Sequence, residues 1–301
     1  MNEIRLTAGD RGYPETLRHL ADPPAALHLR GAQAVELASG GPWPAAVAIV
    51  GARDATAYGL AVARDLGRRL AEAGVVVVSG LAVGIDAAAH RGALEAGGTT
   101  FAVIGCGTDV DYPRTNARLR EEILETGLVL GEQAPGTPAL GHHFPARNRI
   151  LSALSMGVVV VEATLRSGSL SSARHALEQG REVFAVPGPV TSPRSRGPHW
   201  LLKQGARLVE GVEDVLGELP GLSQLSPRGL PGGLSQPCVE ILEAISGGAT
   251  SVDAIALRLG RKVPGILEDL LVLELRGEVL RGPAGSLARA SSTGRSAGEQ
   301  D

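Results

Sequence analysis

The chain has 301 residues, of which 44% are hydrophobic and 3% aromatic, enough for one large domain and a smaller one. The formal net charge of −3 excludes a global positive field that would attract nucleic acid, so a polyanion site must come from local clusters. Two cysteines provide no disulfide framework and no other metal-ligand spacing occurs, so we predict neither a metal nor a cofactor. Without a signal peptide or an apolar run as long as a membrane span, we expect a soluble, cytoplasmic protein with no membrane partner.

The first 45 residues differ in pattern from the long central region. Residues 1–45 are expected to form a short helical lead-in with proline breaks. From residue 46, helical patterns alternate with short β-branched runs, which are AVAIVG (46–51), VVVVSG (75–80), TTFAVIG (99–105), LVLG (128–131), GVVVVEA (157–163) and EVFAVPG (182–188). Continuous apolar strands bounded by helices indicate a parallel sheet covered on both faces. We therefore predict an α/β fold for residues 46–219, a Rossmann-like, doubly wound, mostly parallel sheet with ligands beyond the carboxyl ends of its strands.

A second, smaller domain is predicted near the end of the chain. Residues 220–237 have the composition of a linker, rich in glycine, proline and serine. Residues 238–288 contain three amphipathic helical patterns followed by EVLRGPAGSLAR, which is typical of a small hairpin, so we predict a winged-helix-like module. Residues 289–301 have the composition of a disordered tail.

Five segments that directly follow strands place glycine or serine where a strand gives way to a helix. They are GARDATAYG (51–59), SGLAVGIDAAAH (79–90), GCGTDVDYPRTN (105–116), FPARNRI (144–150) and RSGSLSSA (166–173). Such glycines let backbone N–H groups approach an anion, and helix N-termini add a favourable dipole. A single glycine here often makes only a tight turn, but five loops at one edge favour an anion-binding rim. The residues expected on it are Gly51, Gly80, Gly84, Gly105, Gly107 and Gly168, with charge from Arg53, Arg147 and Arg149.

Known nucleotide-binding motifs do not account for this rim. Gly80 and Gly84 are spaced G-x-x-x-G, no G-x-G-x-x-G opens the first helix of the sheet, and no G-K-[ST] of a P-loop occurs.

Four longer blocks resemble the DNA-processing protein family DprA, also called Smf. They are SGLAVGIDAAAHRGAL, GCGTDVDYPRTN, HHFPARNRILSALS and VVEATLRSGSLSSARHALEQGREVFAVPG, in family order and at family spacing between about residues 13 and 210. The resemblance implies an extended Rossmann-like core that binds single-stranded DNA. It also implies a homodimer that protects incoming strands during natural transformation and helps to load the RecA recombinase.

The resemblance also implies roles for individual residues. Arg53 matches an arginine that contacts DNA phosphate, and the R-N-R and S-G-S blocks match conserved family segments. Phe144 lies where a relative could stack a base, although a buried core phenylalanine is the alternative. The predicted DNA-binding set is Gly51, Arg53, Ser79, Gly80, Gly84, Gly105, Phe144, Arg147, Asn148, Arg149, Ser167, Gly168 and Ser169.

Three positions depart from the family pattern. Gly141 stands where relatives often carry lysine, so one phosphate contact is missing or partly replaced by the imidazoles of His142 and His143. His199 replaces an asparagine in GPHWLL, and Gly131 replaces a serine. These departures weaken single contacts but not the assignment.

Several acidic residues and one histidine are candidates for catalysis. Asp86 and His90, at i and i+4, share a helix face and could form a dyad or brace the preceding loop. Asp109 and Asp111 could bind a metal, but a solvated acidic loop is the stronger interpretation because no third ligand has suitable spacing. The family resemblance implies no catalytic set, so we predict no catalytic residue and no enzyme.

Two alternatives remain open. A nucleotide phosphoribohydrolase of the LOG type would carry P-G-G-x-G-T-x-x-E, whereas RSGSLSSARHALE lacks this pattern and places Glu178 a full helix after the turn. A duplex-DNA regulator would act through the winged helix, but residues 238–282 hold seven acids and five bases, a net charge of −2. Only Arg261 and Lys262 could grip phosphate there, so we predict an auxiliary or interaction module.

Overall fold

The computed structural model describes residues 3–223, 225, 236–275, 279–282 and 286–289. The chain divides into two compact units, residues 1–230 and 231–301. Each unit has a hydrophobic core of its own.

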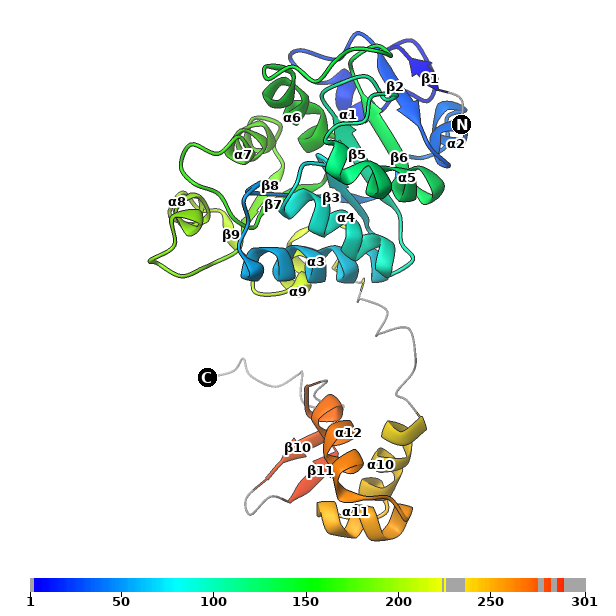
Figure 1. The fold of residues 1–301 in the computed structure, drawn as a ribbon, viewed down its shortest axis with the longest axis vertical. Helices are drawn as coiled ribbons and strands as arrows, with labels where there is room; N and C mark the ends of the chain where they lie inside the picture. The colour runs from blue at the N-terminus through cyan, green and yellow to red at the C-terminus, as the bar shows by residue number, and fades with distance from the viewer. Residues whose placement is uncertain (1–2, 224, 226–235, 276–278, 283–285, 290–301) are drawn as a thin grey trace, which may run out of the picture. The chain divides into compact units, whose positions relative to one another are not determined.

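The first unit is built on a nine-stranded sheet with the order β1-β2-β6-β5-β4-β3-β7-β8-β9 (Figure 1). The seven strands from β6 to β9 in this order pair in parallel, whereas β1 and β2 are antiparallel at one edge. The predicted doubly wound, mostly parallel sheet is thus confirmed. The strands are β1 (Ile4–Leu6), β2 (Leu27–Arg30), β3 (Ala46–Val50), β4 (Val76–Ser79), β5 (Thr100–Ile104), β6 (Leu128–Gly131), β7 (Gly157–Val160), β8 (Glu182–Ala185) and β9 (Arg207–Leu208).

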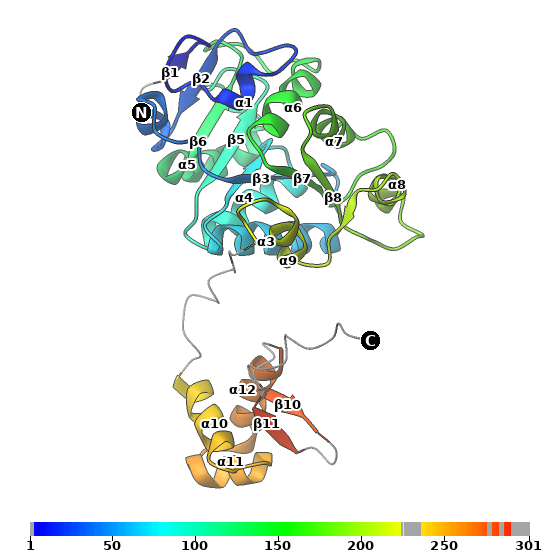
Figure 2. The ribbon, with the colours of Figure 1, turned by 180° about the vertical axis from the view of Figure 1, so that it is seen from behind.

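Helices cover both faces of this sheet, because apolar side chains leave each central strand in both directions. In β3, Ala46, Ala48 and Val50 pack on one face, and Val47 and Ile49 pack on the other. The helices of the first face are α1 (Glu15–Arg18), α2 (Ala34–Ala38), α6 (His143–Ala153), α7 (Ser169–Glu178) and α8 (Arg196–Lys203). Those of the other face are α3 (Ala57–Glu72), α4 (Ile85–Glu95), α5 (Ala117–Thr126) and α9 (Val212–Glu218), seen from behind in Figure 2.

The N-terminal 45 residues are not the helical lead-in that the sequence predicted. From residue 3 to residue 45, where the segment is described, α1 and α2 are its only α-helices, and β1 and β2 extend the sheet. The physical reason is the alternating stretch that includes Leu27 and Leu29, which are both fully buried while β2 pairs with β6. Trp43 fastens the end of the segment, since its indole N–H donates to the Gly12 carbonyl and its ring packs edge-on against Phe101 at 6.2 Å.

The second unit contains α10 (Gln236–Ser246), α11 (Val252–Leu259) and α12 (Val263–Leu275), followed by β10 (Val279–Arg281) and β11 (Leu287–Arg289). The two strands pair antiparallel, so three helices and a hairpin form as predicted. The predicted linker falls mostly on residues 224 and 226–235, and the predicted disordered tail on 290–301, all outside the described residues. Leu222, however, packs in the hydrophobic core of the first unit, which therefore extends into the predicted linker. Across the described ranges, no helix is long and apolar enough to span a membrane.

Candidate nucleic-acid interface

A large cavity lies where the strand order of the sheet reverses. Strand β3 is followed in space by β4 on one side and β7 on the other, and ligands bind open α/β sheets at such a switch point. The cavity has a volume of about 760 Å³ and lies beyond the carboxyl ends of these strands. Eight of the predicted DNA-binding residues line it: Gly51, Arg53, Phe144, Arg147, Asn148, Ser167, Gly168 and Ser169. Gly80 and Gly105 line a small adjoining cavity that shares Arg53, Phe144 and Arg147.

Arg53 and Phe144 form one wall of the cavity. The guanidinium carbon of the exposed Arg53 lies 5.4 Å from the centroid of the Phe144 ring, within the range of a cation–π contact. The ring of Tyr112 packs on Phe144 with 5.4 Å between centroids and a tilt of 32°. Phe144 is half-buried and lines the cavity. The structure therefore favours the stacking interpretation of Phe144 over that of a core side chain.

Arg147 is a buried cation at the base of the cavity. Its guanidinium donates to the Gly80 carbonyl at 3.1 Å and to the side-chain oxygen of Asn148 at 3.2 Å. Burial lowers the pKa of Arg147 to about 10, and the neighbouring Asp86 works against this shift, so Arg147 stays charged at neutral pH. Glycine at position 80 leaves room for this guanidinium, because a Cβ there would lie 2.4 Å from Arg147 Nη2 and the Arg147 side chain would have to shift.

The loop between β4 and α4 contacts both Asp86 and Arg147. Asp86 accepts hydrogen bonds from the N–H groups of Gly80 and Ala82 at 3.1 and 3.4 Å. Burial raises the pKa of Asp86, while the charge of Arg147 opposes the shift. Gly84 has a φ of +85°, and a Cβ on it would lie 2.3 Å from the carbonyl oxygen of Ala52. This loop thus packs against the backbone beside Arg53.

Two residues predicted to bind DNA have a supporting position instead. The Ser79 hydroxyl donates to the Ile49 carbonyl at 2.6 Å, and the residue is fully buried. Gly84 packs on the backbone of the β3–α3 loop, as described above. Neither residue lines the cavity or its small neighbour. Of the three predicted residues of the β4–α4 turn, only Gly80 lines a cavity, and its N–H already donates to Asp86, so the turn supports the cavity and supplies no free phosphate cradle from these residues.

A turn at the start of α7 closes the opposite wall. The Asn148 side-chain amide donates to Ser171 Oγ at 2.7 Å and to the Gly168 carbonyl at 3.2 Å, which ties the R-N-R block to the S-G-S turn. The hydroxyls of Ser167 and Ser169 lie 2.6 Å apart. The first N–H groups of α7 are already engaged in this turn, because Leu170 donates to the Ser167 carbonyl at 3.2 Å and Ser171 donates to the Gly168 carbonyl at 3.0 Å.

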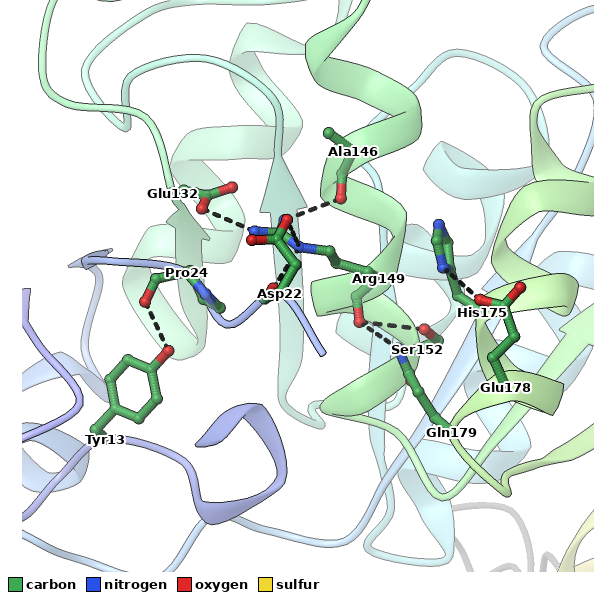
Figure 3. A network of polar contacts seen from close by, with 10 residues as sticks. All are labelled: Tyr13, Asp22, Pro24, Glu132, Ala146, Arg149, Ser152, His175, Glu178 and Gln179. Carbon is green, nitrogen blue, oxygen red and sulfur yellow. Dashed lines mark hydrogen bonds and ion pairs between the residues drawn. The ribbon is translucent and has the colours of Figure 1, made fainter. Parts of the chain in front are cut away.

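Arg149 points away from the cavity, contrary to the prediction (Figure 3). Its guanidinium donates to the Asp22 carbonyl at 2.9 Å, to Glu132 Oε1 at 2.8 Å and to the Ala146 carbonyl at 3.0 Å. Residues two apart on a helix are rotated by about 200°, so Arg147 and Arg149 cannot face the same ligand. Arg149 instead fastens the N-terminal segment to α6.

Two family models match this chain, each over most of one unit. Residues 5–220 match the family DNA recombination-mediator protein A, and residues 227–285 match the DprA winged helix domain. The chain belongs to the DprA family.

Relatives at substantial identity cover most of the chain. Protein Smf of Escherichia coli is 43% identical over 295 residues, covering 94% of this chain and 77% of that protein. Among solved structures, DNA processing protein A of Streptococcus pneumoniae has a TM-score of 0.67 at 42% identity, covering 73% of this chain and 75% of its own. The protein of Helicobacter pylori, solved to explain its single-stranded DNA binding mode, has a TM-score of 0.63 at 32% identity, covering 71% and 94%.

In this member of the DprA family, the candidate catalytic residues hold loops in place. The His90 ring hydrogen-bonds to the Thr100 hydroxyl at 2.7 Å, and neither His90 nor Asp86 bonds to the other in the contacts described. Asp109 accepts from the Gly136 N–H at 2.8 Å, and Asp111 pairs with Arg120 at 3.3 Å. Within the described ranges, no group of three or more His, Cys, Asp or Glu residues could hold a metal ion.

The glutamates of the first unit also lie in supporting positions. Glu162 accepts from both the N–H and the hydroxyl of Thr56, the N-cap residue of α3. Glu178, the residue weighed for a phosphoribohydrolase, lies 3.4 Å from the His175 ring at the end of α7 and does not line the main cavity (Figure 3).

The positions that depart from the DprA family pattern are all accommodated. Gly141 lines the cavity, and His143 Nδ1 lies 3.1 Å from the Gly105 carbonyl, so this imidazole holds the β5 loop. His142 packs on His143 at 4.4 Å between ring centroids. His199 Nε2 lies 3.0 Å from the Gly188 carbonyl.

Tyr112 and Arg194 line the cavity but are not among the residues predicted from the sequence. Tyr112 stands in the quoted GCGTDVDYPRTN block and is one of only three tyrosines, so its position beside a proline was an available signal. Arg194 lines the cavity from the loop between β8 and α8, and it bonds to Asp54. No motif marks Arg194, because only the fold brings its loop next to the loop that follows β3.

Proposed function

We propose that this protein binds single-stranded DNA without strong sequence preference in the cavity beyond β3 and β7. The observation that carries the proposal is the Arg53 guanidinium over the Phe144 ring, next to the buried charge of Arg147. An arginine beside an exposed aromatic face suits a phosphate followed by an unpaired base. The single-stranded DNA binding mode of the related Helicobacter pylori protein supports the same ligand.

The chemistry of the cavity favours the backbone of DNA over base edges. Arg53 supplies a charge-assisted contact to phosphate, and the paired hydroxyls of Ser167 and Ser169, which line the cavity, add a neutral donor. Phe144 and Tyr112 supply π-faces, which every base can stack on. The lining of the cavity holds three arginines and two aspartates, so its formal charge is positive although the chain carries a net charge of −3.

A homodimer that delivers DNA to RecA in the cytoplasm is the fuller role we infer. Membership in a family of recombination mediators supports the RecA partner. One protomer offers few basic contacts, and two cavities on one strand would add avidity without any new contact. This role predicts that the protein speeds RecA assembly on strands coated with single-strand binding protein, which a strand-exchange assay measures.

The first test is Arg53→Ala in fluorescence anisotropy with labelled oligo-dT. We expect a loss of about 1–3 kcal/mol in binding free energy, the range of a hydrogen bond to a charged group. Arg118→Ala is the matched control, since this arginine is 94% exposed on α5 and does not line the cavity.

Two conditions complete the measurement. Affinity should fall with salt through counterion release, and duplex of equal length should not displace the strand. An Arg53→Ala variant that binds as tightly as the unchanged protein would remove Arg53 from the interface. Absence of single-strand binding by the unchanged protein would refute the proposed function.

A further inference from the structure

Arg194 joins the segment after β8 to the loop after β3. It lies between β8 and α8, yet its Nε donates to the backbone carbonyl of Asp54 and its Nη2 to the Asp54 carboxylate. Asp54 directly follows Arg53 in the loop after β3. All three residues line the main cavity. Arg194 is thus a third cation of the cavity, and a carboxylate already occupies it.

The backbones on both sides are fixed without this ion pair. The Arg194 N–H donates to Ser192 Oγ at 3.3 Å, and its carbonyl accepts from the Ala163 N–H at 2.7 Å. Across the gap, the Tyr58 hydroxyl donates to the Pro187 carbonyl at 2.8 Å. Displacement of the Asp54 carboxylate from Arg194 Nη2 would therefore release that side chain, while the bond from Nε to the Asp54 carbonyl and the contacts above keep both backbones in place.

The two ends of the ion pair differ in exposure. The Asp54 side chain is 93% exposed, and that of Arg194 is 29% exposed. A pair with such an exposed partner contributes little to stability, so its cost of opening is small. A phosphate oxygen uses the same guanidinium N–H donors as a carboxylate oxygen and carries at least as much charge. A DNA phosphate can therefore take the place of the Asp54 carboxylate.

Given the proposed function, we propose that Arg194 is a phosphate-contacting residue and that Asp54 is its built-in competitor. In the free protein the Asp54 carboxylate pairs with Arg194 and neutralises its charge. When a strand enters, phosphate replaces the carboxylate on Arg194. The other acid of the cavity, Asp86, is buried and bonded to the loop after β4, so it does not compete in this way. Asp54 thus sets the affinity below what the three arginines could provide.

The test measures oligo-dT affinity for two variants and their matched controls. Arg194→Gln should weaken binding about tenfold, and Asp54→Asn should strengthen it about threefold. Arg196→Gln removes an exposed arginine two residues further on, and Glu182→Gln removes an exposed acid at the opposite end of β8. Neither residue lines the cavity, and both controls should bind like the unchanged protein.

The double variant separates competition at Arg194 from a general charge effect. If Asp54 acts through Arg194, Asp54→Asn should give almost no gain when Arg194 is already glutamine. Arg194→Gln should also reduce the slope of log affinity against log salt by about 0.7, the value for one phosphate of a single strand.

The outcomes are distinct. Unchanged binding by Arg194→Gln would overturn the phosphate contact, and an equal gain from Asp54→Asn with and without Arg194 would overturn the competition. In either case binding by the unchanged protein and its loss in Arg53→Ala would leave the proposed function standing. If the unchanged protein binds no single strand, both proposals fail together.

Discussion

At the scale of single residues, the cavity rests on ionisable groups that are buried behind it. Asp86 and His90 lie on α4 and Arg147 lies on α6, and each has a shifted pKa with burial as the largest cause. Burial disfavours the charged form of each group, and Asp86 and Arg147 partly offset this cost for each other. His90 has no such charged partner among the described residues, since its Nδ1 bonds to the neutral Thr100 hydroxyl and its Nε2 is buried without a hydrogen bond. Protonation of His90 therefore destabilises the folded protein.

His90 makes folding stability depend on pH. Burial lowers its pKa from 6.5 to about 3, so the unfolded chain binds more protons than the folded one between these values. Stability is full above about pH 6.5 and is lost as the pH falls towards 3. We expect about 2 kcal/mol less stability at pH 5 than at pH 7 from this residue alone. Urea unfolding of the unchanged protein and of His90→Gln at both pH values measures it, and an equal pH dependence in the two would contradict the assignment.

At the scale of elements, loops after parallel strands meet at one edge, and their glycines differ in what they do. Gly80 leaves room for Arg147, whereas Gly84 lets one loop pack against the carbonyls beside Arg53. Gly168 has open space where a Cβ would be, so its role is not steric. The backbone of the Arg53 loop is thus positioned by its neighbour across the sheet edge.

Gly84→Ala should disturb both stability and DNA binding. The substitution combines a φ of +85° with a backbone oxygen 2.3 Å from the new Cβ, so we expect a loss of about 2 kcal/mol or more in stability. Single-strand affinity should fall with it, because the Arg53 loop must move. Gly97→Ala is the control, with a φ of +67° and nothing within 4 Å. It should cost about 1 kcal/mol and leave affinity unchanged, as thermal unfolding and anisotropy would test.

How much of these elements could be predicted from sequence depends on where the signal lies. The core strands carry long β-branched runs, so their order of appearance and parallel pairing could be predicted. Strand β2 could not, since LHLR is short, lies beside prolines and becomes a strand only because β6 offers it an edge. At the candidate site, loop glycines and arginines were found, but the sequence analysis did not apply helical spacing to Arg147 and Arg149. Arg194 could not be predicted, because only the fold brings the segment after β8 next to the loop after β3.

At the scale of the whole molecule, the cations of the two units are used differently. In the first unit the exposed Arg53 has no ion pair with the described residues and faces the cavity. In the second unit, Arg258 donates to the Gly247 carbonyl and Arg261 pairs with Asp269, so two of its basic residues are engaged internally. Together with the excess of acids in residues 238–282, this favours an auxiliary role for the winged helix over duplex binding.

Removal of residues 231–301 should therefore leave single-strand binding almost unchanged. The first unit retains its own cores and every residue that lines the main cavity. We expect the dissociation constant for oligo-dT to stay within about twofold, because no phosphate contact is lost. Anisotropy on the shortened and full chains, each with duplex competitor, measures this. A loss of tenfold or more would show that the winged helix holds part of the strand.

The two tryptophans lie in the first unit and differ in their exposure to solvent. Trp43 lies partly buried on Phe101 with its N–H bonded to Gly12, whereas Trp200 on α8 is 48% exposed. Indole emission shifts to longer wavelength as the ring becomes hydrated, so a Trp200→Phe protein would carry one optical reporter placed at the seam between the N-terminal segment and the sheet. The emission wavelength of Trp43 would report detachment of the N-terminal segment, while circular dichroism would report unfolding of the helices. Undocking of β1 and β2 thereby becomes visible as an event separate from the melting of the sheet.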